Sequence, residues 1–318
     1  MFMTNATKII RKKKRWTSAD TQILLLAVPT AVWFLLFSYL PMFGVIISFK
    51  KYRINGDFLH SLISSKWVGL HYFKMLLNND DVWIALRNTL GYNIVMLVIG
   101  TTFTIGLALL VSELYSKRLA KLYQTLMFFP YFLSWVVITA LAWGFLSSSM
   151  GIANDVLVKL GFAKHNFYME TKFWPPFLVF MSQWKGIGYG MIVYLATITA
   201  LDKEVYEAAL IEGASKWQQI IRITLPMMKT VIVLMFILGV GKIFYSDFGL
   251  FYQVPRDSNT LANTVTTLDV FVYKQLMSPS SPIGMTAAAA LFQSATAFIL
   301  TLAANKIVSK IDPDSAMI

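Results

Sequence analysis

The sequence predicts an all-α integral membrane protein with six transmembrane helices, and its composition and apolar runs support this. The chain of 318 residues is 57% hydrophobic and only 14% charged, whereas about a quarter of the residues in a soluble domain are usually charged. Uncharged apolar runs of about 18 or more residues are candidate membrane helices. Four stretches contain no Asp, Glu, Lys or Arg: 21–49, 88–112, 122–154 and 275–305. Two further apolar stretches, 173–201 and 230–246, contain one lysine each.

The elements follow in a simple order along the chain. A basic segment, 1–22, precedes a transmembrane domain over 23–306, and a short tail, 307–318, ends the chain. The six expected spans cover about 23–48, 88–111, 125–147, 177–200, 226–246 and 284–306. The first connection, about 49–87, contains Trp67, Tyr72 and Phe73. These aromatic side chains suit either a helix that lies on the membrane surface or simple packing against the spans.

Basic residues set the expected partners and orientation. The formal net charge of +12 would indicate nucleic-acid binding in a soluble protein. Beside membrane spans, Lys and Arg instead meet anionic lipid headgroups, so we expect membrane lipid and no nucleic acid as a partner. The segment "KIIRKKKR" precedes the first span and predicts a cytoplasmic N-terminus, and six spans then place the C-terminus on the same side. The first apolar run is too long for a cleavable signal peptide.

The polar connection 201–225 is predicted to fold as two short helices joined by a turn. Asp202 is a good N-cap for the first helix, and Gly213 is suited to the left-handed turn that ends it. Ser215 and Gln218 form the S-x-x-Q pattern of a capping box, which starts the second helix. Pro226 is expected to stop the second helix and to open the next span. Such a stiff element, joined directly to a span, could transmit force from a cytoplasmic partner into the bilayer.

This connection resembles the cytoplasmic "EAA" loop of permease subunits of binding-protein-dependent ABC importers. The loop pattern is E-A-A, three residues, G, nine residues, and I-x-L-P. The matching residues are Glu207, Ala208, Ala209, Gly213, Ile223, Leu225 and Pro226. Glu212 stands where the family usually has Asp, which keeps the charge. The resemblance implies a type I ABC importer permease fold in which these residues form a coupling helix that docks on an ATPase subunit.

Other segments resemble the carbohydrate branch of these permeases, over roughly residues 20–312. They include "WVGLHYF", "RNTL" and "QTLMFFPYFLSWVV" and are similar to maltose-type permeases of the subgroup for complex or polysaccharide-derived sugars. An importer of alginate-like oligosaccharides is one candidate. The resemblance implies a second, related permease subunit, two cytoplasmic ATPase subunits and an external solute-binding protein in a bacterial inner membrane. It also implies that this subunit catalyses no reaction.

The motifs that are missing agree with a transport subunit that does not itself bind nucleotide. The sequence has no G-x-x-x-x-G-K-[ST] loop, so ATP and Mg²⁺ are expected on the partner ATPase subunits, and no cofactor is expected on this chain. A stand-alone secondary carrier is a second reading, but such carriers usually need acidic groups within their spans. A membrane-embedded lipid-modifying enzyme is a third reading. It would need carboxylates or histidines gathered at one membrane face, and the sequence shows no such group.

Polar and aromatic residues within the spans are candidates for the substrate path. Lys185 lies about nine residues into the fourth span, and Tyr189, four residues later, shares its helix face. Because a charge at this depth is costly, such a lysine indicates a functional site. The full set of candidates is Trp143, Trp184, Lys185, Tyr189, Lys242, Tyr245, Asp247 and Gln293. Core packing is the alternative for Trp143 and Gln293, while Lys242 could instead extend to the headgroups or pair with Asp247.

The two intramembrane lysines, Lys185 and Lys242, indicate an acidic sugar such as a uronic-acid oligomer. This hypothesis rests on the absence of a matching buried acid in the spans. It is tested by Lys185→Ala, which should reduce transport of acidic oligosaccharides more than transport of neutral ones.

Overall fold

The computed structural model describes residues 17–311, so the basic N-terminal cluster and residues 312–318 of the expected tail lie outside the described part. The chain divides into two compact units, Met1–Ile46 and Ile47–Ile318, which are described separately. In the first unit, α1 (Ser18–Phe34) begins at a capping box between Thr17 and Asp20. The helix continues through the π-helical η1 (Leu35–Tyr39) into the 3₁₀-helical η2 (Leu40–Phe49). Its large apolar side chains are exposed, as expected of a helix that is surrounded by lipid or by another helix.

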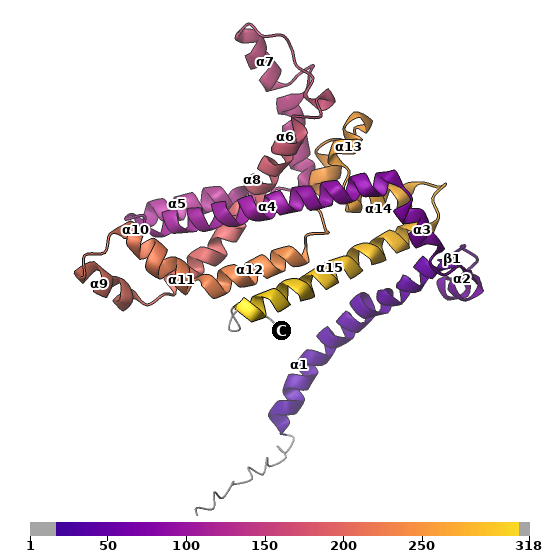
Figure 1. Cartoon of the computed structure of the whole chain (residues 1–318), viewed down its shortest axis with the longest axis horizontal. Coiled ribbons are helices and arrows are strands. Elements are labelled where there is room, and N and C mark those ends of the chain that lie inside the picture. The colour runs from indigo at the N-terminus through magenta and orange to yellow at the C-terminus, as the bar shows by residue number, and fades with distance from the viewer. Residues whose placement is uncertain (1–16, 312–318) are drawn as a thin grey trace, which may run out of the picture. The chain divides into compact units, whose positions relative to one another are not determined.

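The second unit is almost entirely helical (Figure 1). Its one sheet is a two-stranded antiparallel ribbon of β1 (Lys50–Lys51) and β2 (Lys66–Trp67). The helices of the first half are α2 (Phe58–Ser64), α3 (His71–Leu77), α4 (Asp80–Ser112), α5 (Lys117–Phe128), η3 (Phe129–Phe132), α6 (Trp135–Leu146), α7 (Ile152–Lys159), η4 (Phe167–Met169) and α8 (Trp174–Thr199). Those of the second half are α9 (Lys203–Ile211), α10 (Lys216–Gln219), η5 (Ile220–Thr224), α11 (Leu225–Met227), α12 (Lys229–Gly241), η6 (Gly249–Gln253), η7 (Asn259–Leu261), α13 (Ala262–Val265), α14 (Leu268–Met277) and α15 (Ile283–Ile311).

Long helices pack in pairs to form the core. The helix α8 packs along both α4 and α5, and α12 packs against α15 (Figure 1). One buried cluster includes Trp174, Leu178 and Phe251, which join the start of α8 to η6. A second includes Tyr72 and Met285, which join α3 to α15. Apolar contacts between segments far apart in the sequence therefore hold α8 to η6 and α3 to α15.

Length and composition identify only some of the expected spans. Among residues 17–311, three helical stretches are long and apolar enough to cross a membrane: Asp20–Phe49, Asp80–Ser112 and Ile283–Lys310. Two bent helix pairs raise this number to five if each pair counts as one crossing. The helix α8, which carries Lys185, coincides with the expected fourth span but falls outside this set. The last helix continues five residues beyond the predicted end of the sixth span, to Ile311.

Two expected spans are not single straight helices. Over 125–147, the chain turns by 97° between Phe132 and Trp135, because Ser134 caps a new helix shortly after Pro130. The helix expected to stop at Pro226 ends one residue later, at Met227, and the chain then bends by 61°. The π-helical turn η5 precedes Pro226, and its wider hydrogen-bond spacing makes room for a residue that lacks an N–H.

The first connection packs on the bundle through its aromatic residue Tyr72. This side chain is only 4% exposed, and a Cβ atom added at Gly284 of α15 would overlap the Tyr72 ring. Of the two expected roles of this connection, packing therefore applies to Tyr72, whereas Trp67 remains 60% exposed.

Candidate functional site

The bend between η3 and α6 is the centre of the candidate site. From α8, the Lys185 ammonium donates hydrogen bonds to the carbonyl oxygens of Tyr131, at 2.8 Å, and Leu133, at 2.6 Å. The last carbonyls of a helix have no partners within the helix and carry a partial negative charge. Lys185 therefore supplies both the missing donor and the compensating charge at this break.

Aromatic rings surround the Lys185 ammonium. Tyr189 of α8 stacks on Tyr131 with 4.7 Å between the ring centroids, and Tyr131 also stacks on Phe128 at 5.6 Å. The ammonium lies 5.6 Å from the Tyr131 ring centroid and 5.4 Å from that of Trp135. The Tyr189 ring is half exposed, so an aromatic face remains available to a ligand. The structure thus brings the predicted pair Lys185 and Tyr189 together.

Sequence reasoning missed Tyr131 and Trp135 as members of this site. The available signal was the aromatic stretch "FFPYFLSW", in which a proline and a serine interrupt an otherwise continuous apolar run. Pro and Ser mark helix ends, so the stretch could have been recognised as a break rather than as the middle of a span.

Close backbone packing explains how Lys185 reaches the break. A Cβ atom at Gly188, three residues along α8, would overlap the carbonyl of Met127 and the backbone nitrogen of Phe128. Only glycine lets α8 approach the end of α5 this closely. Gly186, by contrast, faces open space.

Asp247 joins the same site through Trp135. The Trp135 indole N–H donates to the Asp247 carboxylate at 2.7 Å, and the other Asp247 oxygen accepts from the backbone N–H of Gly249 at 3.0 Å. A Cβ atom at Gly249 would overlap Trp135, so this glycine also makes room for the indole. In the described part of the chain, Asp247 does not form the ion pair with Lys242 that the sequence left open.

Lys242, Tyr245 and Asp247 line a cavity of about 330 Å³ between α4, α8 and the end of α12. The Lys242 ammonium has no hydrogen-bonding partner among residues 17–311, whereas the Tyr245 hydroxyl donates to Ser294 at 2.9 Å. Asn93 and Gln183 add amide groups to the lining. The cavity therefore offers a cation together with polar donors and acceptors.

Gln293 takes part in a hydrogen-bond network centred on Asp269. The side chain of Gln293 is buried and donates to the carbonyl of Phe244 at 2.6 Å and to both Asp269 oxygens at 3.2 Å. Asp269 also accepts from the backbone N–H of Ser246 at 2.7 Å. Gln293 is therefore buried in the bundle and held there by these hydrogen bonds.

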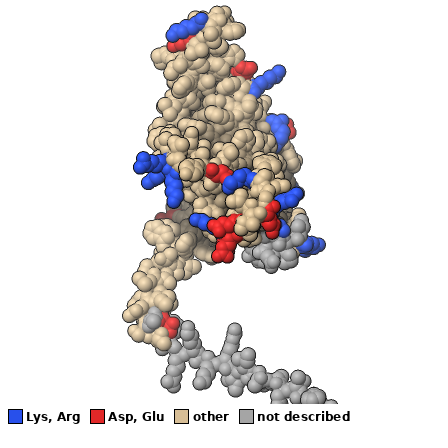
Figure 2. All heavy atoms as spheres, turned by 90° about the vertical axis from the view of Figure 1, so that its left-hand side faces the viewer, with Lys and Arg blue, Asp and Glu red and all other residues tan. Residues whose placement is uncertain are grey.

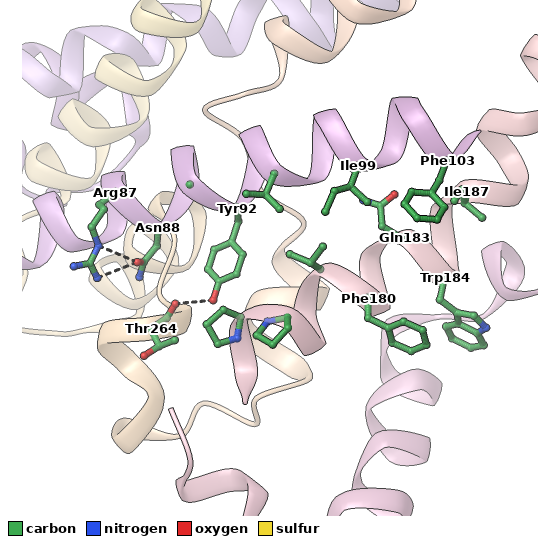
Figure 3. Close-up of a pocket in the computed structure, with 15 residues that line it drawn as sticks. Arg87, Asn88, Tyr92, Ile99, Phe103, Phe180, Gln183, Trp184, Ile187 and Thr264 are labelled. Carbon is green, nitrogen blue, oxygen red and sulfur yellow. Dashed lines mark hydrogen bonds between the residues drawn. The ribbon is translucent and has the colours of Figure 1, made fainter. Parts of the chain in front are cut away.

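Trp143 and Trp184 lie in two other places. The Arg256 guanidinium stacks 3.9 Å above the Trp143 ring, and Tyr168 meets that ring edge-on at 5.1 Å. Burial raises the pKa of Tyr168 to about 12, while nearby Arg256 opposes the rise. Trp184 instead lines an apolar groove of about 950 Å³ between α4 and α8, which Arg87 and neighbouring residues border at one end (Figure 3). Neither tryptophan shares the Lys185 site.

The polar connection 201–225, here called the elbow, forms a separate candidate site at the other end of the bundle. The Asp202 carboxylate caps α9, and Gly213 adopts a left-handed φ of 83°. The backbone N–H of Ala214 reaches back to the carbonyl of Ala209 at 2.9 Å, which completes a Schellman motif. The capping box between Ser215 and Gln218 is present as predicted.

Most residues of this elbow are exposed. Acidic and basic side chains gather at the end of the molecule that carries α9 and α10 (Figure 2). They are accompanied by exposed apolar groups, with Ile211 87% and Trp217 69% exposed. The motif residues fall in two groups. Glu207, Ala208, Ala209, Glu212 and Gly213 lie in α9 and its turn, and Ile223, Leu225 and Pro226 lie near the end of the next helical segment, Lys216–Met227.

Comparisons with known proteins agree with this arrangement. Residues 100–312 match the family model described as "Binding-protein-dependent transport system inner membrane component". The polygalacturonan/rhamnogalacturonan transport system permease protein YteP of Bacillus subtilis (strain 168) is 33% identical over 91% of this chain and 88% of its own length. Protein LplB of the same strain is 32% identical over 94% of this chain and 93% of its own length.

Solved structures show the same fold. The chain is similar to one from a bacterial ABC transporter involved in the import of the acidic polysaccharide alginate, with a TM-score of 0.82. The two are 29% identical, and the match covers 92% of this chain and 97% of that one. A structure of a bacterial alginate ABC transporter in complex with an alginate pentasaccharide-bound periplasmic protein matches with a TM-score of 0.81. The chain therefore belongs to the family of binding-protein-dependent transport system inner membrane components.

Proposed function

We propose that the chain is one of two related membrane-spanning subunits of an ATP-driven importer for an acidic oligosaccharide. An external solute-binding protein would deliver the sugar, and two cytoplasmic ATPase subunits would bind ATP and Mg²⁺. The observation that carries this proposal is the exposed elbow with the EAA spacing, in a chain of this family. The acidic substrate is supported by two relatives, one named for polygalacturonan transport and one for import of alginate.

The elbow would act as the coupling element. In this proposal, α9 sits in a groove of an ATPase subunit, and closure of the ATPase dimer on ATP displaces α9. Because the Schellman turn at Gly213 and the capping box at Ser215 fix the angle between α9 and α10, the displacement passes to the fifth span. The bundle then changes from an inward-facing to an outward-facing state.

Lys242 is the better candidate for recognising a sugar carboxylate. Lys242 lines the cavity of about 330 Å³, and its ammonium has no hydrogen-bonding partner among the described residues, whereas Lys185 already donates to two carbonyls. The exposed faces of Tyr189 and Tyr131 would stack on sugar rings in the path. Lys185 would then hold the path in shape.

The central test is co-purification and uptake. The complex should contain an ATP-hydrolysing partner, and a binding screen on the cognate solute-binding protein should favour acidic over neutral oligosaccharides. A chain that purifies alone and transports without ATP would support the secondary carrier instead. Lipid-modifying activity without transport would support the enzyme.

Gly213→Leu tests the coupling element. A bulky residue at a φ of 83° is strained, so the turn should open and uptake should fall while ATP hydrolysis continues. Gly161→Leu is the matched control, since Gly161 has a φ of 85° and also faces open space. It lies between the third and fourth expected spans, on the side that a cytoplasmic N-terminus places outside the cell. Normal uptake by Gly213→Leu would contradict the proposed mechanism.

The orientation is testable because the chain has no cysteine. A single cysteine at Ile211, in α9, should react with a membrane-impermeant maleimide only after the membrane is opened. A cysteine at Met150, which is 75% exposed between α6 and α7, should react in spheroplasts. The reverse pattern would place the elbow outside the cell and exclude ATPase docking.

A further inference from the structure

One side chain ties the protruding helix α9 to the base of the fifth span. Tyr206 and Ala209 are the two residues of α9 that are not exposed. The Tyr206 hydroxyl lies 2.9 Å from the Thr224 hydroxyl oxygen, which is 18 residues further along the chain. A cavity of about 270 Å³, lined in part by Tyr206, Thr224 and Glu113 of the α4 end, adjoins this contact. The helix α9 therefore contacts the bundle through the hydrogen bond of Tyr206 and is exposed along most of its length.

The partner of Tyr206 belongs to the π-helical turn η5. Thr224 is 4% exposed, and its hydroxyl donates to the carbonyl of Gln219 at 3.4 Å. Each hydroxyl carries one proton and accepts through its oxygen, so either Tyr206 or Thr224 can be the donor in the contact between them. The turn is closed by a bond from the Leu225 N–H to the carbonyl of Ile220, five residues back. Single π turns of this kind are rare and frequently occur at functional sites.

The hydrogen bond between Tyr206 and Thr224 joins α9 directly to η5, which the chain otherwise connects only through a turn. The covalent path from α9 to η5 passes through Gly213 and the four-residue α10. Rotation of α9 about Gly213 must therefore either move Thr224 as well or break this bond. A second link from the elbow, an ion pair of Lys216 and Glu113 at 3.0 Å, is largely exposed. It should contribute little, because water and salt screen it.

We propose that the Tyr206 hydroxyl is a positioning group that transmits the displacement of α9 into the π turn and so into the fifth span. The inference rests on the proposed function, because it requires an ATPase that moves α9. It assigns the transmission of that movement to the Tyr206 hydroxyl, and Tyr206 is not one of the residues that match the EAA pattern. The bond is lost in Tyr206→Phe with the removal of one oxygen atom, and also in Thr224→Val.

The experiment measures uptake and ATP hydrolysis by the whole complex in proteoliposomes. In Tyr206→Phe, we expect normal assembly and ATP hydrolysis, with the ratio of sugar transported to ATP hydrolysed reduced between about twofold and tenfold, the range that one hydrogen bond contributes. Thr224→Val should give the same reduction, the double variant should be no worse than either single variant, and Thr224→Ser should retain the normal ratio. Tyr115→Phe is the matched control, since Tyr115 is fully exposed near the same end of the bundle.

The outcomes separate the inference from the proposed function. Suppose that the unmodified complex hydrolyses ATP and transports sugar, but Tyr206→Phe keeps the normal ratio of sugar transported to ATP hydrolysed. The role inferred for Tyr206 is then wrong, and the proposed function stands. Additive losses of this ratio in the double variant, or loss of the ATPase subunit from the purified Tyr206→Phe complex, would assign Tyr206 to docking or folding. Either result would also overturn the role inferred for its hydroxyl. If the unmodified chain neither binds an ATPase nor transports, the proposed function itself fails.

Discussion

The two bent helix pairs differ in how their bends are held. The bend of 97° before α6 is bridged by the Lys185 ammonium, which bonds two backbone carbonyls. The bend of 61° before α12 follows a π turn that is tied to the elbow by the neutral contact of Tyr206 and Thr224. Charge-assisted hydrogen bonds are about twice as strong as neutral ones.

Backbone packing increases this difference. At the first bend, Gly188 brings α8 against the end of α5, and Gly249 admits the Trp135 indole. At the second, α9 projects from the bundle with a cavity at its base. The first bend is therefore closely packed, whereas the second adjoins a cavity and the projecting α9. In the proposed function, the first would be a fixed part of the path and the second a joint that a partner moves.

The largest expected effect is that of Gly188→Leu. Its side chain would overlap backbone atoms of Met127 and Phe128, which cannot rotate away. We expect a loss of at least about 3 kcal/mol of stability, the upper range for overpacking, seen as a lower thermal midpoint in detergent. Gly186→Leu, at a position with open space, should stay near the unmodified value. Equal midpoints for the two variants would show that the first bend is not fixed by this packing.

Lys185→Ala should have the next largest effect. It removes two hydrogen bonds from a charged donor, which are worth about 1.5–3 kcal/mol each when buried and less here because one is exposed and the other only partly buried. It also leaves the carbonyls at the break without this donor. Because Lys185 is bound to the protein itself, uptake of acidic and neutral oligosaccharides should fall by the same factor. A selective loss of acidic transport would instead support direct recognition of the sugar by Lys185, as the sequence alone predicts.

Lys242→Met should show whether Lys242 recognises the sugar carboxylate or only maintains the structure of the path. If the Lys242 ammonium meets a sugar carboxylate, its removal should reduce uptake of acidic oligosaccharides by about tenfold, equivalent to about 1.4 kcal/mol, and leave neutral ones nearly unchanged. The thermal midpoint should not change, since this ammonium bonds no group in the described residues. Equal losses for both sugar classes would remove Lys242 from the recognition site.

The smallest expected effect is that of Trp135→Phe. The substitution keeps an aromatic ring beside Lys185 but removes the indole N–H that donates to Asp247. One such bond to a carboxylate is worth about 1.5–3 kcal/mol when buried, and less here because Asp247 is exposed. We therefore expect a loss of about 1 kcal/mol in the same thermal assay. No change would show that Asp247 does not stabilise the first bend.

Local features of the molecule were predictable from the sequence. The left-handed Gly213 and the capping box from Ser215 to Gln218 depend only on neighbouring residues, because turns and caps are closed within a few residues of the chain. The shared face of Lys185 and Tyr189 likewise follows from helical spacing. The apolar runs identified the long helices because burial in lipid requires an uninterrupted apolar length.

Only the tertiary structure determined the partners of these groups. Lys185 meets carbonyls 52 and 54 residues away, and Trp135 meets Asp247 across 112 residues. Every backbone carbonyl is an equivalent acceptor in the sequence, so the choice among them depends on which helices approach closely enough. That approach is set by packing at Gly188 and Gly249. The lack of a side chain there permits close contact with a neighbouring segment, and the sequence does not show which segment that is.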